Sequence, residues 1–411
     1  MTLDVGAEGA RGPGRDSAQA DMAGRHRYEA LDALRGVCAL CVCLFHFRAT
    51  GPLALLPFVR GSWLFVDFFF VLSGFVIAAS SRERLVAGGY LRPFILLRLG
   101  RVYPLHVVVL AAFVVMELVG LALASKGLML REPFVGPRSV PSIFSNLLLL
   151  QAVGLHPMLT WNEPGWSIAA EFWTYLLFAL AAQRAGQRLE IWLVAAIIVS
   201  IAVLLLATSN GINVSHSWSL FRCIYGFAVG ALAWRWWSDR GLGPQRGGIG
   251  ATALELTAVA LVVAFVSQIS NNPVNLLAPL VFVAALLVFA RQGGAVSRLL
   301  LRPPLQMLGL WSYSIYMVHV FVQSRMDDGL RLLGRATGLS FLSHDRLSNG
   351  TPFDRVGANA AQGVVLTFAM LAFVIAAAAL TWQFIERPGQ RWARRQVDAL
   401  PSGRGVGRKH A

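Results

Sequence analysis

The sequence predicts an all-α protein, a polytopic membrane helical bundle of about ten transmembrane helices. Of its 411 residues, 56% are hydrophobic and only 14% are charged, and the mean hydropathy is +0.59, which is far too apolar for a soluble domain. Apolar runs of membrane-spanning length recur along the whole chain. Lys and Arg gather in the short segments between these runs, as in cytoplasmic loops of membrane proteins. The net charge of +15 therefore reflects loop charge, and no basic domain indicates a nucleic-acid partner.

The apolar runs give the order of the spans and, with the charges, the topology. The predicted spans lie near 31–49, 63–80, 103–124, 164–183, 190–208, 218–237, 251–269, 276–290, 305–324 and 358–384. A further run at 142–155 is too short to cross comfortably. Leaving it out of the count places 24 Lys and Arg inside and 10 outside, whereas a crossing would place 14 inside and 20 outside. The positive-inside rule thus favours ten spans, cytoplasmic termini and a short interfacial or re-entrant helix near 142–155.

These spans define one membrane domain, 28–388, between two tails. Residues 1–27 are rich in Gly, Ala and Arg and are expected to form a disordered cytoplasmic tail, and 389–411 to form a basic cytoplasmic tail. Pro388 is expected to end the last helix because proline cannot continue one. The longest outer polar segment, 325–357, is equally compatible with an acceptor-recognition lid and with a flexible connection.

The first span carries two ionisable residues, Arg35 and His46. Eleven residues are about three helical turns, so both side chains lie on one face, roughly 16 Å apart along the axis. An ionisable residue inside a bilayer is costly and indicates a functional site facing the bundle interior. The alternative is that Arg35 extends to the interface and His46 marks the far end of the span.

Titratable residues fall into two layers under this topology. Four side chains from four helices lie at similar depth near the outer surface and predict a polar cavity open to the outside: His46, Asp67, Glu171 and His319. The inner layer is basic, with Arg35, Arg98 and Arg101. Arg98 and Arg101 are three residues apart, so a helix presents both guanidinium groups on one face, which suits phosphate oxygens. The alternative for this pair is that they are positive-inside anchors.

Other polar residues leave two readings open. In the ninth span, Ser312, Tyr316 and His319 recur at helical spacing, either along an acceptor path or as interhelical hydrogen-bonding groups. Arg222 in the sixth span is a buried charge that needs a partner. No metal site is predicted, because the histidines lack metal-ligand spacing and the four cysteines lie within apolar spans.

Short motifs distributed beyond residue 28 carry a family resemblance. They are Leu31-Asp32-x-Leu34-Arg35-Gly36 followed by His46, FVDFFFVLSGF at 65–75, RLGR at 98–101, PGWSIAAEFWTY at 164–175, SYSIYMVH at 312–319 and FIERP at 384–388. In order and spacing they resemble the acyltransferase-3 family of integral membrane acyltransferases. The resemblance implies acyl-CoA, with acetyl-CoA expected, as the donor substrate and no permanently bound cofactor. It also implies a carbohydrate or other hydroxyl acceptor, CoA phosphates near Arg98 and Arg101, and a catalytic His46.

The hypothesis is therefore an O-acyltransferase of the bacterial cytoplasmic membrane that acts on an extracytoplasmic glycan or glycoside. His46 would act as general base on the acceptor hydroxyl. Glu171 or Asp67 would orient His46, as the third member of a triad does, and Arg35 would steer the donor or stabilise developing negative charge, unless it only pairs with Asp32. A secondary transporter or flippase with a polar intramembrane cavity is the alternative.

Overall fold

The computed structural model describes residues 28–125, 132–244, 247–270, 272–346 and 352–400. Each of the ten predicted spans overlaps a helix. These helices are α2 (Glu29–His46), α5 (Phe65–Ala87), α6 (Leu91–Ala124), α8 (Gly165–Ala185), α9 (Leu189–Ala207), α10 (Ser219–Asp239), α11 (Ile249–Ile269), α12 (Ala278–Ala290), α14 (Pro303–Thr337) and α15 (Ala360–Thr381). The expectations for residues 1–27 and for the end of the chain after residue 400 lie outside the described residues.

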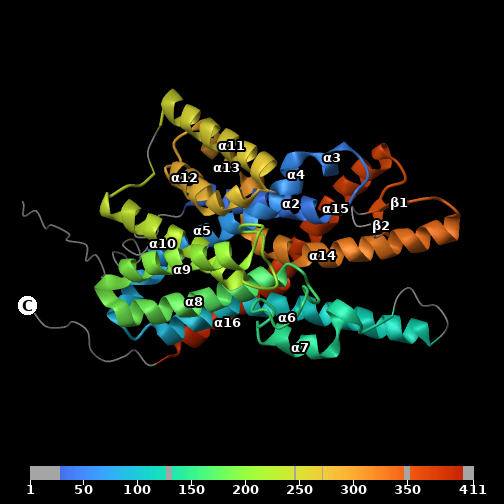
Figure 1. Ribbon diagram of the computed structural model, residues 1–411, viewed down its shortest axis with the longest axis horizontal. Coiled ribbons are helices and arrows are strands. Elements are labelled where there is room, and N and C mark those ends of the chain that lie inside the picture. The colour runs from blue at the N-terminus through green and yellow to red at the C-terminus, as the bar shows by residue number, and fades with distance from the viewer. Residues whose placement is uncertain (1–27, 126–131, 245–246, 271, 347–351, 401–411) are drawn as a thin grey trace, which may run out of the picture.

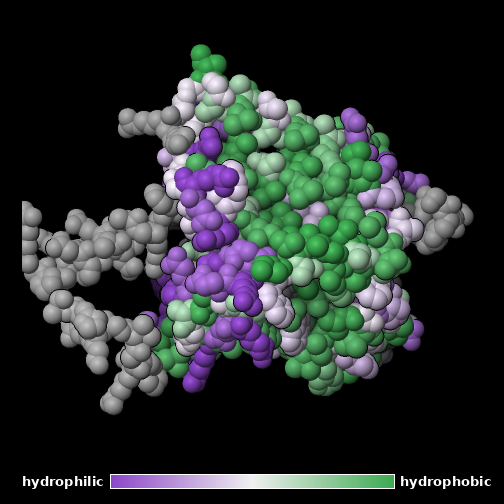
Figure 2. All heavy atoms as spheres, turned by 60° about the vertical axis from the view of Figure 1, so that its left-hand side comes forward, coloured by the Kyte–Doolittle hydropathy of each residue, from purple (hydrophilic) through white to green (hydrophobic). Residues whose placement is uncertain are grey.

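By length and hydropathy alone, 7 helical segments of the described chain qualify as membrane spans, and one of them, Gly165–Ala207, contains both α8 and α9. The first helix α2 is not among them, since Glu29, Asp32 and Arg35 all lie within its 18 residues. An apolar belt crosses the middle of the molecule between two more polar ends (Figure 2). The chain is thus a helical polytopic membrane protein, as the sequence predicts.

Shorter elements connect the long helices. They are α3 (Pro52–Leu55), α4 (Pro57–Gly61), η1 (Ser62–Leu64), η2 (Gly136–Arg138), α7 (Val140–Leu147), η3 (Gly186–Arg188), η4 (Pro273–Leu277), α13 (Ala295–Leu300), β1 (Leu342–Arg346), β2 (Pro352–Val356), the π-helical segment η5 (Trp382–Glu386) and α16 (Arg387–Asp398). Helix α7 overlaps the first part of the predicted short run and has 8 residues, about 12 Å, which is too short to cross a bilayer. It buries Ser142 and Asn146 and exposes Phe144.

The long helices pack closely where small residues face each other. Helix α5 packs along α10, and α14 packs along α2. A Cβ atom added at Gly74 on α5 would collide with the backbone of Phe227, and one at Gly230 on α10 with the backbone of Val71. These paired glycines let the two backbones approach as in small-residue membrane helix contacts.

Connecting segments gather at two opposite ends of the bundle (Figure 1). At one, here the Tyr28 end, the Tyr28 ring lies 6.4 Å from that of Trp237, and Gln306 donates to the Glu29 carbonyl at 2.9 Å. At the other, here the hairpin end, the Thr50 hydroxyl donates to the Gly357 carbonyl at 2.7 Å. Segments predicted to share a side thus lie together, as ten alternating crossings require.

The chain does not stop being helical at Pro388, so that expectation is wrong. Helix α15 continues through the π-helical segment into α16, and Pro388 lies in the first turn of α16. A proline is tolerated there because the first backbone N–H groups of a helix have no intrahelical acceptor. Ala393 of α16 is buried against Gly100 of α6, so α16 belongs to the packed domain.

The outer polar segment is also more regular than a loop. Helix α14 continues to Thr337, and β1 pairs antiparallel with β2, with Leu342 opposite Val356. The backbone N–H of Val356 donates to the Arg48 carbonyl at 2.9 Å. The described part of the segment is therefore joined to the chain that leaves α2.

Candidate active site

One cavity, here the basic cavity, contains all three arginines predicted to bind the donor. Arg35 comes from α2, and Arg98 and Arg101 come from α6. The cavity has a volume of about 80 Å³. The guanidinium carbon of Arg98 lies 5.5 Å from the centre of the Phe94 ring, and its buried Nε has no hydrogen-bond partner among the described residues. A buried N–H donor of this kind favours an anionic ligand in the cavity.

Arg35 is held in place on three sides. Its Nε donates to the Ser312 hydroxyl at 2.7 Å and its Nη2 to the Gly309 carbonyl at 3.2 Å. The same Nη2 lies 3.4 Å from Asp32 Oδ1. The ion pair with Asp32 is thus present, and Arg35 lines the basic cavity as well. Ser312 also lines this cavity rather than the one that contains His46.

Glu171 lies in the basic cavity, so the expected outer layer of four titratable groups is wrong for this residue. Its Oε1 accepts from the Ser73 hydroxyl, and the Tyr175 hydroxyl donates to Ser73 at 3.3 Å. Trp161 and Trp166 precede Glu171 and are of a residue type that is common at membrane interfaces. Both are buried, with exposed fractions of 3% and 7%, so they do not mark a membrane surface.

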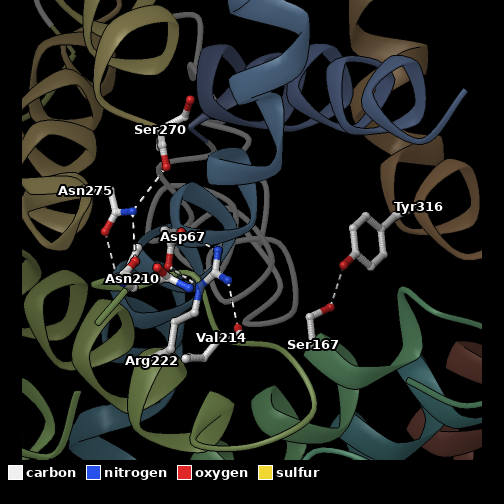
Figure 3. A network of polar contacts seen from close by, with 9 residues as sticks. Asp67, Ser167, Asn210, Val214, Arg222, Ser270, Asn275 and Tyr316 are labelled. Carbon is white, nitrogen blue, oxygen red and sulfur yellow. Dashed lines mark hydrogen bonds and ion pairs between the residues drawn. The ribbon is translucent and has the colours of Figure 1, made fainter. Parts of the chain in front are cut away.

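Asp67 is the partner that the buried charge of Arg222 requires. Arg222 Nε donates to Asp67 Oδ1 at 2.9 Å and Nη2 to Oδ2 at 2.6 Å, while Nη1 donates to the Val214 carbonyl at 2.9 Å (Figure 3). The guanidinium lies between the rings of Trp63 and Trp166, at 5.0 and 5.2 Å. Within the described ranges, neither Asp67 nor Glu171 contacts His46.

His46 instead contacts His319, across 273 positions of sequence. His46 Nδ1 lies 3.3 Å from His319 Nε2 and 2.9 Å from the Val42 carbonyl oxygen. His319 Nδ1 lies 2.7 Å from the Tyr316 carbonyl oxygen. The ring centroids of the two histidines are 4.9 Å apart. The structure therefore brings together two of the predicted site residues that the sequence placed at the same depth.

His46 lines a second, larger cavity, here the outer cavity, at the hairpin end. Its volume is about 940 Å³, at the upper end of the usual range for small-molecule sites. Its wall includes Trp63, Trp166, Arg222, Glu163, Asp327, Gln323 and the strand residues Phe353 to Val356. Val66 and Tyr316 line both cavities. The Tyr316 hydroxyl is held by the Ser167 hydroxyl at 2.7 Å (Figure 3), so the two cavities meet at an ordered side chain.

Strand β2 forms part of the rim of the outer cavity. Asp354 accepts from Arg331 Nη1 at 2.5 Å and from His344 Nδ1 at 2.6 Å. Partial burial raises the pKa of Asp354, but the hydrogen bonds from His344 and Arg331 outweigh it and hold the pKa below its usual value. This strand therefore presents an ionised carboxylate at neutral pH.

Several cavity residues were not selected from the sequence. Ser73 and Tyr175 accompany Glu171 in the basic cavity, and Trp63 and Glu163 line the outer one. A hydroxyl in an apolar span, as at Ser73, is a usable signal because it needs a hydrogen-bond partner. Trp63 begins the predicted second span and Glu163 directly precedes the fourth, at span ends where hydropathy gives no precise depth.

Comparisons with known proteins identify the family of the chain. The acyltransferase domain family matches residues 28–383, and the chain belongs to this family. Together with its apolar helices, this makes it a membrane-embedded acyltransferase of the acyltransferase-3 type.

Two curated proteins are similar to the chain. One is named acyltransferase MdmB, from Streptomyces mycarofaciens, and is 29% identical over 413 aligned positions that cover 91% of this chain and 95% of the relative. The other is named protein 2 in picA locus, from Rhizobium radiobacter, and is 30% identical over 45% of this chain and 96% of its own length. No solved structure matches the chain significantly.

Proposed function

We propose that the protein transfers an acyl group, with acetyl expected, from cytosolic acyl-CoA to a hydroxyl of an extracytoplasmic glycan or glycoside. The observation that carries this proposal is the pair of cavities that meet at Val66 and Tyr316. One is lined by three arginines, and the other contains His46 and opens among polar and aromatic side chains. In the proposed orientation the Tyr28 end faces the cytosol, so a donor made in the cytosol and an acceptor outside approach one junction from opposite sides.

The donor's charge suits the basic cavity. Coenzyme A carries phosphates at one end and the acyl thioester at the tip of a long arm. Arg98 and Arg101 bind the phosphates, because guanidinium groups match phosphate oxygens in charge and geometry. The arm then extends toward Tyr316, and Arg35, which lines the same cavity, steers it.

His46 carries out the proton transfer. Its Nε2 takes the proton of the acceptor hydroxyl while the hydroxyl oxygen attacks the thioester carbonyl carbon. The tetrahedral intermediate collapses as the C–S bond breaks, and the CoA thiolate takes up the proton from His46. The products are the O-acylated acceptor and free CoA, and His46 is again neutral.

Label transfer from radioactive acetyl-CoA tests the proposal. Purified protein in lipid nanodiscs is incubated with the donor and with fractions of a bacterial envelope glycan extract. We expect acid-stable label on a glycan or glycoside that is released by mild alkali, as an ester is. Transmembrane movement of an unmodified solute by the same protein, with no labelled ester from any acyl-CoA, would instead support a carrier.

The arginines of the basic cavity are expected to govern donor affinity. We expect Arg98→Gln to raise the KM for acyl-CoA about 10- to 100-fold, with a smaller change in kcat, because a hydrogen bond to a charged group contributes about 1.5–3 kcal/mol. Steady-state kinetics at varied acyl-CoA measures this. Arg92→Gln, at an exposed position on the same helix and outside the cavity, is the matched control. An equal KM in both variants would remove Arg98 from the donor site.

A further inference from the structure

We propose that His319 is a positioning residue that fixes the tautomer and orientation of His46, in the place that a carboxylate occupies in a catalytic triad. The inference rests on the proposed function of His46 as general base. It replaces the expectation that Glu171 or Asp67 orients this histidine, because both carboxylates have other partners.

The tautomer of His319 follows from its neighbours. A carbonyl oxygen only accepts hydrogen bonds, so the His319 Nδ1 that faces the Tyr316 carbonyl at 2.7 Å carries the proton. The side chain of His319 is fully buried, and among the described residues no carboxylate contacts its ring. A buried histidine without a counter-ion is neutral. Its Nε2 therefore presents a lone pair.

The tautomer of His46 follows in turn. Its Nδ1 faces two acceptors, the Val42 carbonyl and the lone pair of His319 Nε2, so Nδ1 carries the proton. In neutral His46 the lone pair is then on Nε2, on the opposite side of the ring. His46 Nε2 has no partner in the described part of the chain and is not a buried atom. The base thus faces the outer cavity in the form that accepts a proton.

The two acceptors have different roles. Val42 lies one turn before His46 on α2, so its carbonyl is fixed by the helix itself. His319 comes from α14 and contacts the ring from a second helix, which stops rotation of the imidazole away from the acceptor. When His46 takes up a proton, the hydrogen bond from its Nδ1 becomes charge-assisted and strengthens. Glu163 and Arg48 line the same cavity as His46, and neither is hydrogen-bonded to its ring.

Two substitutions of similar size separate positioning from packing. His319→Gln keeps an acceptor oxygen at about the reach of Nε2, whereas His319→Leu fills the space without one. We expect His319→Leu to lower kcat about 10- to 100-fold with the KM for acyl-CoA unchanged, which is the range for a charge-assisted hydrogen bond. His319→Gln should keep activity within about fivefold of wild type. Equal losses in both variants would overturn the proposal.

A spectroscopic measurement tests the same contact without activity. In protein labelled with ¹⁵N-histidine, His46 is assigned by comparison with the His46→Ala variant. We expect its Nδ1 to be protonated and Nε2 to be unprotonated at neutral pH, and this pattern to weaken in His319→Leu, where only the Val42 carbonyl still accepts from Nδ1 and the ring can rotate. A His46 protonated on Nε2 in the wild type would overturn the inference even if label transfer is observed. Absence of label transfer in wild-type protein would count against the proposed function, and the nitrogen pattern would still decide the contact.

Discussion

His46→Ala is expected to lower the rate of acyl transfer by about 10²- to 10⁴-fold, the usual contribution of a general base. The acceptor hydroxyl is a poor nucleophile while it keeps its proton, and His46 lines the outer cavity through which the acceptor is proposed to enter. The KM for acyl-CoA should stay within about threefold, because His46 lines the outer cavity and the arginines line the basic one. Initial rates of label transfer at varied acyl-CoA measure both quantities.

His216→Ala is the matched control, since His216 lies at the hairpin end but lines neither cavity. It should transfer label at the wild-type rate. If His46→Ala keeps a tenth or more of the activity, another group takes the proton, and Glu163 in the same cavity becomes the residue to test. Loss of activity together with a large rise in KM would mean that the substitution disturbs the donor site as well.

The positions of the long helices could be predicted from the sequence, because a helix that spans the bilayer needs a minimum length of apolar residues. The regions where prediction failed lie at or beyond the membrane surface, where that constraint ends. Helix α14 continues past its apolar part to Thr337 and ends where Gly338 adopts a φ of 72°, a backbone conformation that favours glycine. The i,i+3 pair of Arg325 with Asp328 at 2.9 Å supports the extension. A charged helix end such as this one has the low hydropathy of a loop, so hydropathy alone does not reveal it.

The sequence predicted which residues belong to the candidate site better than it predicted which of them contact each other. Arg98 and Arg101 share one helix, so local spacing was enough to place both in one cavity. The pairing of Asp67 with Arg222 and that of His46 with His319 depend on which helices pack together, which one sequence does not determine. Depth was the weakest step, because tryptophan is common at membrane interfaces but also packs inside proteins, and Trp161 and Trp166 are buried.

The Asp67–Arg222 pair is expected to be the most consequential buried contact for stability. Both side chains are almost wholly buried, with exposed fractions of 0% and 2%. Arg222→Met would leave Asp67 as an uncompensated buried charge, and breaking a buried pair in this way costs about 3–5 kcal/mol. The measurement is equilibrium unfolding in mixed detergent micelles. Arg235→Met is the control on the same helix, because Arg235 is 46% exposed in its pairs with Asp239 and Glu190, and exposed pairs should each contribute less than about 1 kcal/mol.

A double variant separates the role of the pair in stability from its role in the site. Asp67→Leu combined with Arg222→Met replaces both charges by apolar groups and should recover most of the lost stability. Arg222 also lies between Trp63 and Trp166 in the wall of the outer cavity. If the pair shapes that wall for the acceptor, the recovered protein should still show a raised KM for the acceptor at an unchanged KM for acyl-CoA. Recovery of stability and of both KM values together would make the ion pair dispensable for acceptor binding. A double variant as unstable as Arg222→Met would show that the surrounding helices require the charges themselves.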